Sequence, residues 1–153
     1  MTIEERIKQS RFKNAHHKLA INLMNTTNKL ESFLKEIFKK EEITLQQYNI
    51  LRILRGSRPN PLSTLQIRER MMHKMSDTSR IVDRLLMKKL VTKKISDNDN
   101  RLVDVHITDK GLQLLQSLDD IEDKLADFMA NLTDTEATTL SNLLDKITDG
   151  SAN

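Results

Sequence analysis

Arg80 and Arg84, one helical turn apart, are the residues of this sequence best suited to binding chemistry. A guanidinium group stays charged and donates paired hydrogen bonds to phosphate or to a base edge. The surrounding segment, residues 52–101, holds thirteen Lys or Arg and five Asp or Glu, a balance of +8. The balance of residues 102–153 is −8, and that of the whole chain is only +3. A basic middle segment of this kind favours a polyanionic partner.

No residue set suited to catalysis or metal binding accompanies this segment. Cysteine is absent, which excludes disulfides and thiolate metal sites. His16 and His17 are adjacent and point in different directions on a helix, which argues against a shared metal ion. No nucleophile with a base and an orienting acid can be assembled, and there is no Gly-rich phosphate loop. We therefore expect a binding protein rather than an enzyme, without cofactor or metal.

The elements that would position the two arginines are mainly helical. The chain has only three Gly and two Pro, and apolar residues recur at spacings of three and four. Residues 4–40 predict one long helix or two helices with a bend. Capping boxes at Thr44, Ser63 and Thr133 predict three further helix starts. The arginines themselves lie on a predicted helix that ends near Lys89, and its opposite side is apolar.

Two short β-branched runs, residues 91–95 and 102–107, follow this helix and predict a hairpin with a polar connection. The order of these elements is helix, short helix, turn, basic helix and hairpin. It predicts a winged helix-turn-helix. The fold class is therefore mainly α (α+β). A DNA major groove about 12 Å wide admits one helix, and the projecting wing reaches the neighbouring minor groove. The expected DNA contacts are Ser76, Asp77, Ser79, Arg80 and Arg84 from the helix, and Lys93, Lys94, Asn98, Asp99, Asn100 and Arg101 from the wing.

Apolar residues near the C-terminus form a candidate dimer interface. Their spacings of three and four are typical of a helix-packing seam, which could lie within one subunit or between two. We favour a homodimer, because the basic middle segment cannot cover two long apolar-faced helices at once. The residues of this candidate interface are Leu118, Ile121, Leu125, Phe128 and Leu132, with Leu140 and Leu144 on the last helix.

Over nearly its whole length the chain resembles the MarR-type bacterial transcriptional regulators. The resemblance is carried by Ser79-Arg80-Ile81-Val82-Asp83-Arg84-Leu85, then Leu90-Val91, the wing residues Asp99-Asn100-Arg101, and Ile107-Thr108-Asp109-Lys110-Gly111. It implies that residues 76–88 lie in the major groove, while Asp99 positions Arg101 in the minor groove. The sequence departs from the family at Lys89, where Gly is usual, and at Asn100, where a second Arg is frequent.

The resemblance also implies how the molecule is organised. We expect one MarR-like domain over residues 1–153, with a winged lobe at 43–108 and interlocking dimerisation helices at 1–42 and 109–149. A pseudo-palindromic operator and repression of neighbouring genes follow from the same resemblance. A small-molecule effector would bind between the dimer helices and the lobe and would shift the population of lobe spacings. Phe12, His16 and His17 are the candidate residues of this effector cavity.

One alternative function stays open, a winged-helix module that binds protein without specific DNA binding. The salt dependence of binding to random duplex would separate the two functions. No uninterrupted apolar run is long enough to span a membrane, and the charged start is unlike a signal peptide. We therefore expect no membrane association and a cytoplasmic location.

Overall fold

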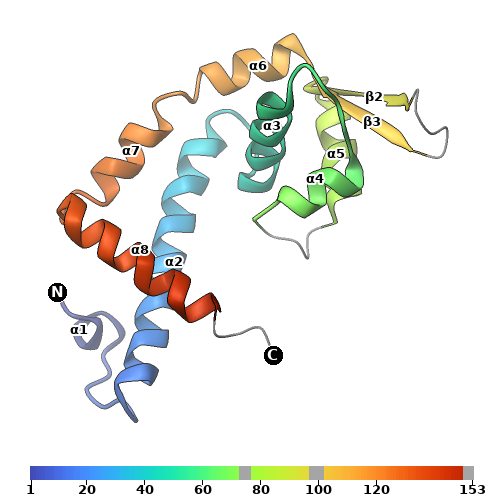
Figure 1. Cartoon of the computed structure of the whole chain (residues 1–153). Coiled ribbons are helices and arrows are strands. Elements are labelled where there is room, and N and C mark those ends of the chain that lie inside the picture. The colour runs from blue at the N-terminus through green and yellow to red at the C-terminus, as the bar shows by residue number, and fades with distance from the viewer. Residues whose placement is uncertain (73–76, 97–101, 150–153) are drawn as a thin grey trace. The chain divides into compact units, whose positions relative to one another are not determined.

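The computed structural model describes residues 1–72, 77–96 and 102–149 (Figure 1). The chain divides into two compact units, residues 1–115 and 116–153. Among the described residues helices dominate, as expected, and three short strands form one sheet. The helices are α1 Ile3–Ile7, α2 Ala15–Lys39, α3 Leu45–Ser57, α4 Thr64–Arg70, α5 Thr78–Met87, α6 Asp109–Gln116, α7 Ile121–Phe128 and α8 Asp134–Asp149, and the strands are β1 Leu62–Ser63, β2 Val91–Ile95 and β3 Val103–Ile107.

The N-terminal region forms two helices separated by a non-helical segment. Lys8 ends α1 in the left-handed region, with φ of 54°. The side chain of Asn14 caps α2 by accepting a hydrogen bond of 2.8 Å from the backbone N–H of His17. The apolar spacing predicted one helix or two joined by a bend, but it did not predict that residues 8–14 leave the helix altogether.

All three predicted capping boxes are confirmed. Gln47 N–H donates to the Thr44 hydroxyl at 3.1 Å and Gln66 N–H donates to the Ser63 hydroxyl at 3.2 Å. Glu136 N–H donates to the Thr133 hydroxyl at 3.3 Å. In each box, the side chain three residues after the cap accepts the cap residue's own N–H. These hydrogen bonds satisfy backbone N–H groups that the first turn of a helix leaves unpaired. The three helices therefore begin directly after Thr44, Ser63 and Thr133.

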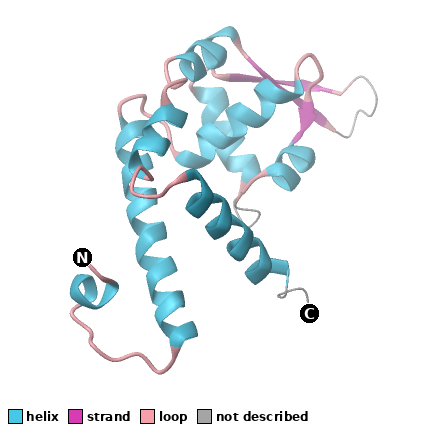
Figure 2. Ribbon diagram, turned by 60° about the vertical axis from the view of Figure 1, so that its left-hand side comes forward, coloured by secondary structure: helices cyan, strands magenta, loops and turns pink. Residues whose placement is uncertain are grey.

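The predicted hairpin is also confirmed, and it belongs to a three-stranded antiparallel sheet in the order β1-β3-β2 (Figure 2). Val91 pairs with Ile107, and Ile95 pairs with Val103. The sequence did not predict β1, which has only two residues and pairs Leu62 with Val105. Its partner strand lies more than forty positions away, so the pairing leaves no local pattern.

The core of residues 1–115 lies where α3, α4 and α5 meet the sheet. Each of these helices contacts the other two, α3 and α4 contact β3, and α5 contacts β2. Aliphatic residues fill this core, as the shortage of aromatics predicts. Those with exposed fractions of 2% or less are Ile50, Leu51, Leu54, Ile67, Val82, Leu85, Leu90, Val91 and Val105.

Helix α5 ends in two hydrogen bonds typical of a Schellman motif. Leu90 N–H donates to the Leu85 carbonyl at 3.0 Å, and Lys89 N–H donates to the Leu86 carbonyl at 2.9 Å. This motif requires a left-handed backbone at the residue before Leu90. That residue is Lys89, which adopts a φ of 61°. Lys89 therefore takes the backbone conformation that a glycine adopts without steric cost.

In residues 116–149 the predicted seam is interrupted. Leu118 precedes α7 and Leu132 follows it, so only Ile121, Leu125 and Phe128 share one helix. The expectation of a continuous helical seam from Leu118 to Leu132 was wrong. The apolar spacing continues through both breaks, which is why it did not reveal them.

Candidate nucleic-acid interface

Helix α5 presents Arg80 and Arg84 on its exposed side. Asp77 begins the helix by accepting a hydrogen bond of 3.2 Å from the backbone N–H of Arg80. Thr78, Val82 and Leu85 are buried on the other side. Ser79, Arg80 and Arg84 are all exposed, in agreement with the predicted faces. The two guanidinium groups are thus available to an anionic partner.

The buried side of α5 is held by specific contacts as well as by apolar packing. The Thr78 hydroxyl donates to the Met71 sulfur at 3.4 Å. Two residues after the end of α4, Met72 N–H donates to the side-chain oxygen of Asn49 on α3 at 3.3 Å. The first bond ties α5 to the end of α4, and the second ties the residues after α4 to α3. Helix α5 also contacts α3, so the exposed arginines stand on a supported helix.

A depression of about 320 Å³ lies between α5 and the beginning of α3. Arg80, Ile81 and Arg84 border it on one side, and Thr44 and Gln46 border it on the other. The amino end of a helix carries partial positive charge, which adds to that of the two arginines. The sequence identified Thr44 only as a cap, because its proximity to Arg80 and Arg84 depends on tertiary packing.

The two lysines of the wing strand β2 differ in their surroundings. Lys94 is exposed. Lys93 forms an ion pair with Asp83 of α5, and its side chain is only 27% exposed. Neighbouring residues of a strand point to opposite faces, so one lysine faces α5 and the other faces away. The sequence had assigned both lysines to DNA contact.

The other predicted DNA contacts divide into two groups. Asp77 is exposed and its carboxylate is engaged as the cap of α5. Ser76, Asn98, Asp99, Asn100 and Arg101 lie outside the described residues.

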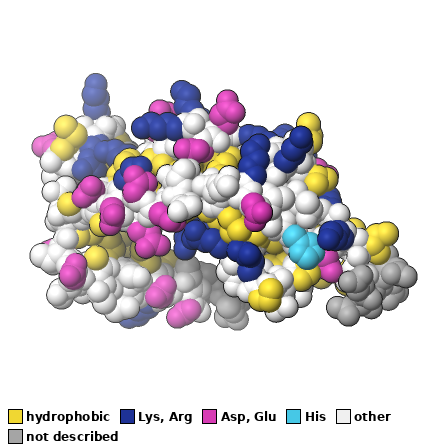
Figure 3. All heavy atoms as spheres, turned by 90° about the horizontal axis from the view of Figure 1, so that it is seen from above, with side chains coloured by type: hydrophobic (Ala, Val, Ile, Leu, Met, Phe, Trp, Pro, Cys, Tyr) yellow, Lys and Arg dark blue, Asp and Glu magenta, His cyan; other side chains and the backbone are white. Residues whose placement is uncertain are grey.

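Basic side chains are not confined to α5 and β2. Figure 3 shows several groups of Lys and Arg on one face of the molecule, with Asp and Glu side chains among them. The basic side chains on that face therefore do not form a uniform positive surface. Among the described residues, Arg80 and Arg84, both exposed on α5, are best placed to meet an anionic partner.

Residues 43–103 match the family model of the MarR family. The resemblance inferred from the sequence, which rested largely on Ser79–Leu85 of this segment, is confirmed.

Several solved structures share the fold of the chain. A MarR transcription factor from Planctomyces limnophilus is 29% identical, with a TM-score of 0.68 over 92% of this chain and 100% of that one. A mutant MarR from E. coli complexed with operator DNA is 24% identical, with a TM-score of 0.78 over 90% and 99% of the two chains. The MepR–DNA complex from S. aureus is 17% identical, with a TM-score of 0.78 over 92% and 99%. No curated protein sequence matches the chain. The predicted fold class, a mainly helical winged helix-turn-helix, is confirmed.

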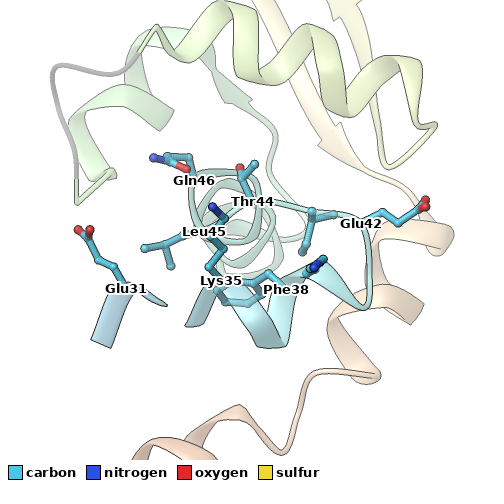
Figure 4. Close-up of a pocket in the computed structure, with 9 residues that line it drawn as sticks. Glu31, Lys35, Phe38, Glu42, Thr44, Leu45 and Gln46 are labelled. Carbon is cyan, nitrogen blue, oxygen red and sulfur yellow. The ribbon is translucent and has the colours of Figure 1, made fainter. Parts of the chain in front are cut away.

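A larger cavity of about 700 Å³ lies between the end of α2 and the beginning of α3 (Figure 4). Its apolar lining comes from Phe38, Ile43 and Leu45, and charged side chains stand around it. The lining residues are Glu31, Lys35, Phe38, Lys39, Glu42, Ile43, Thr44, Leu45 and Gln46. We call this space the α2–α3 cavity.

The predicted effector residues lie elsewhere, at the opposite end of α2. The rings of Phe12 and His17 meet edge to face with centroids 5.8 Å apart, and Lys13 N–H donates to His17 Nδ1 at 3.2 Å. His16 is exposed in the same turn. None of the three lines the α2–α3 cavity.

Within the described part of the chain, no three His, Asp or Glu side chains are grouped so that they could hold a metal ion. None of the helices in residues 1–72, 77–96 and 102–149 combines the length and the hydropathy needed to cross a membrane.

Proposed function

We propose that this chain is a transcriptional regulator that binds specific sequences of double-stranded DNA and is not an enzyme. The observation that carries the proposal is the exposed pair Arg80 and Arg84 on α5, a capped helix of a MarR-family domain. An α-helix with its side chains is about 10–12 Å wide, which matches the major groove. MarR from E. coli and MepR from S. aureus, which share the fold, are both seen bound to DNA.

In this proposal α5 enters the major groove and the β2–β3 hairpin lies beside the neighbouring minor groove. Arg80 and Arg84 contact base edges or the phosphates that line the groove, and exposed Lys94 contacts phosphate from the wing. Arg101, which lies outside the described residues, keeps the minor-groove role implied by the family resemblance.

The regulator acts as a homodimer on a pseudo-palindromic operator. Helix α8 supports this part of the proposal, because none of its described residues is buried although its sequence is amphipathic. Leu140, Leu143 and Leu144 are 43%, 54% and 37% exposed on one side of α8. A second copy of the chain would cover this apolar face, and residues 1–42 would contribute to the same interface.

We further propose a ligand-responsive repressor in the bacterial cytoplasm, with the α2–α3 cavity as the effector site. Its apolar lining and charged rim suit a small, largely apolar molecule with one polar group. The Lys88 ammonium, directly after α5, donates to the carbonyl oxygen of Glu42 on the cavity rim. A ligand that moves this rim would therefore act on the end of α5. It would change the fraction of molecules whose lobes have the spacing that binds DNA.

Binding of a random-sequence duplex at several salt concentrations tests the proposed function. If a dimer neutralises about eight phosphates, log K falls against log salt with a slope of about −7. A slope near zero would instead support the protein-binding alternative.

Arg80→Ala and Arg84→Ala test the assignment of DNA reading to α5. Each is expected to weaken operator binding by about 1–3 kcal/mol if the arginine contacts a base edge. Arg6→Ala, which removes an exposed arginine from α1, serves as the control and should leave the affinity nearly unchanged. Equal losses on operator and random DNA would make the two arginines phosphate contacts only.

A further inference from the structure

Lys93 and Asp83 join the wing to α5. The Lys93 ammonium, on β2, forms an ion pair and hydrogen bond with Oδ1 of Asp83 on α5. The Lys93 side chain is 27% exposed and that of Asp83 is 59% exposed. Asp83 and Lys93 are ten positions apart, so the pair connects two separate elements.

The strand register explains why this lysine points toward α5. Lys93 pairs with Val105, and Val91, two residues earlier on the same face of β2, pairs with Ile107. Val91 and Val105 are almost fully buried, and β2 contacts α5. Thr92 and Lys94, on the other face of the strand, are exposed. The pleat thus directs Lys93 along the covered face of the hairpin.

The position of Asp83 gives the pair an electrostatic consequence. Asp83 follows Arg80 by three residues and precedes Arg84 by one, and all three are exposed on α5. An uncompensated carboxylate there would repel the phosphates that the arginines attract. The ammonium of Lys93 offsets this charge without adding a net positive charge to the interface.

We propose that Lys93 and Asp83 are positioning residues, which hold the wing at a fixed place beside α5, and that Lys93 does not contact phosphate. This inference rests on the proposed DNA binding and replaces the expectation that Lys93 and Lys94 act alike. Lys94 is the phosphate contact of β2. The ion pair fixes the relative placement of two elements that must meet neighbouring grooves at the same time.

A double-mutant cycle of Lys93→Met, Asp83→Asn and both together tests the pair, and Lys94→Met is the matched control. The cycle is first measured without DNA, as hydrogen exchange of hairpin amides such as Ser96 N–H, which bonds the Leu102 carbonyl at 3.0 Å. Each single change should speed this exchange by about two- to fivefold, and the double variant should be no faster than the singles. Additive effects would overturn the pairing.

Affinity for an operator duplex is then measured against salt. Lys94→Met should make the salt slope shallower by about one unit for each phosphate that the variant no longer neutralises. Lys93→Met should weaken operator binding by about two- to fivefold with an unchanged slope, and Asp83→Asn in the same chain should cause no further loss. If Lys93→Met changed the slope as Lys94→Met does, Lys93 would be a phosphate contact and the inference would be wrong. Failure of the unmodified protein to bind any duplex would contradict the proposed function, whereas the DNA-free cycle would still test the ion pair.

Discussion

Lys89 has a left-handed backbone, with φ of 61°, directly after the helix that presents Arg80 and Arg84. Its side chain is exposed, so no packing compensates for the steric cost of this conformation. The family usually has glycine at this position, and the structure shows that the helix keeps the glycine-type ending with a lysine in its place. At the residue scale, the end of α5 therefore carries a local cost that one substitution can remove.

Lys89→Gly is expected to raise the free energy of unfolding by up to about 1 kcal/mol, since glycine adopts positive φ without the Cβ clash. Urea denaturation at one protein concentration measures this change as a higher midpoint with an unchanged slope. Lys89→Ala removes the same charge and keeps the Cβ atom, so it should give no such gain. Equal gains from both variants would assign the effect to charge.

At the scale of elements, the start of α6 packs closely against the end of α5. Thr108 links them, because its hydroxyl donates to the Lys89 carbonyl at 2.8 Å and accepts from Gly111 N–H at 3.1 Å. A Cβ atom on Gly111 would lie 2.5 Å from the Leu90 carbonyl oxygen and 2.7 Å from Cγ1 of Ile107. The glycine therefore sets the distance at which the helix approaches the sheet.

Gly111→Ala is expected to lower the free energy of unfolding by about 1–3 kcal/mol, because the backbone of Leu90 must move to admit the methyl group. Gly56→Ala is the matched control, since a Cβ atom there meets nothing within 4 Å and the residue lies in α3. It should stabilise the protein by up to about 1 kcal/mol through helix propensity. Thermal or urea denaturation of both variants measures the difference, and losses of equal size would contradict the close approach at Gly111.

The capping box of α8 predicts a pH dependence. Hydrogen bonds from the backbone N–H and then the hydroxyl of Thr133 hold the pKa of the Glu136 carboxyl below its ordinary value of 4.5. The stability that they contribute is fully present above the pKa of an unfolded glutamate and is lost as the pH falls through the lowered pKa. In a ¹³C NMR titration, Thr133→Ala should move the Glu136 midpoint up toward the ordinary value. An unchanged midpoint would contradict the contribution of the hydroxyl, because the backbone N–H at position 133 still donates in the variant.

At the scale of the whole molecule, the proposed dimer explains the apolar side of α8. In a single chain Leu140, Leu143 and Leu144 stay partly exposed, and α8 has no buried residue among those described. A contiguous apolar face that is exposed in one chain is typical of a surface that contacts another molecule. The dimerisation role of residues 1–42 and 109–149 stays a prediction that solution measurements can decide.

Leu140→Asp combined with Leu144→Asp should convert the dimer to monomer, because both carboxylates would be buried at the interface without partners. Sedimentation equilibrium at micromolar concentration measures the change. Asn142→Asp places the same charge on the opposite side of α8 and should leave the dimer intact. A folded monomer of the unmodified chain at this concentration would contradict the dimer itself.

The sequence by itself determined the helix starts at Thr44, Ser63 and Thr133, the β2–β3 hairpin and the two unlike faces of α5. Each of these features depends on hydrogen bonds between residues close in the chain, or on the directions in which their side chains point. Its signal is therefore local. The MarR-family motif predicted which helix of the fold α5 is. The apolar periodicity alone predicts only that the segment is helical.

Only the tertiary structure decided which side chains meet across elements. It separated Lys93, paired with Asp83, from exposed Lys94, and it brought Thr44 to the depression beside Arg80 and Arg84. The same is true of β1, whose partner strand lies far along the chain. These proximities arise from packing between segments, and no spacing within one segment records them. The direction of a charged side chain, and hence whether it contacts DNA or another element, is therefore decided by the fold.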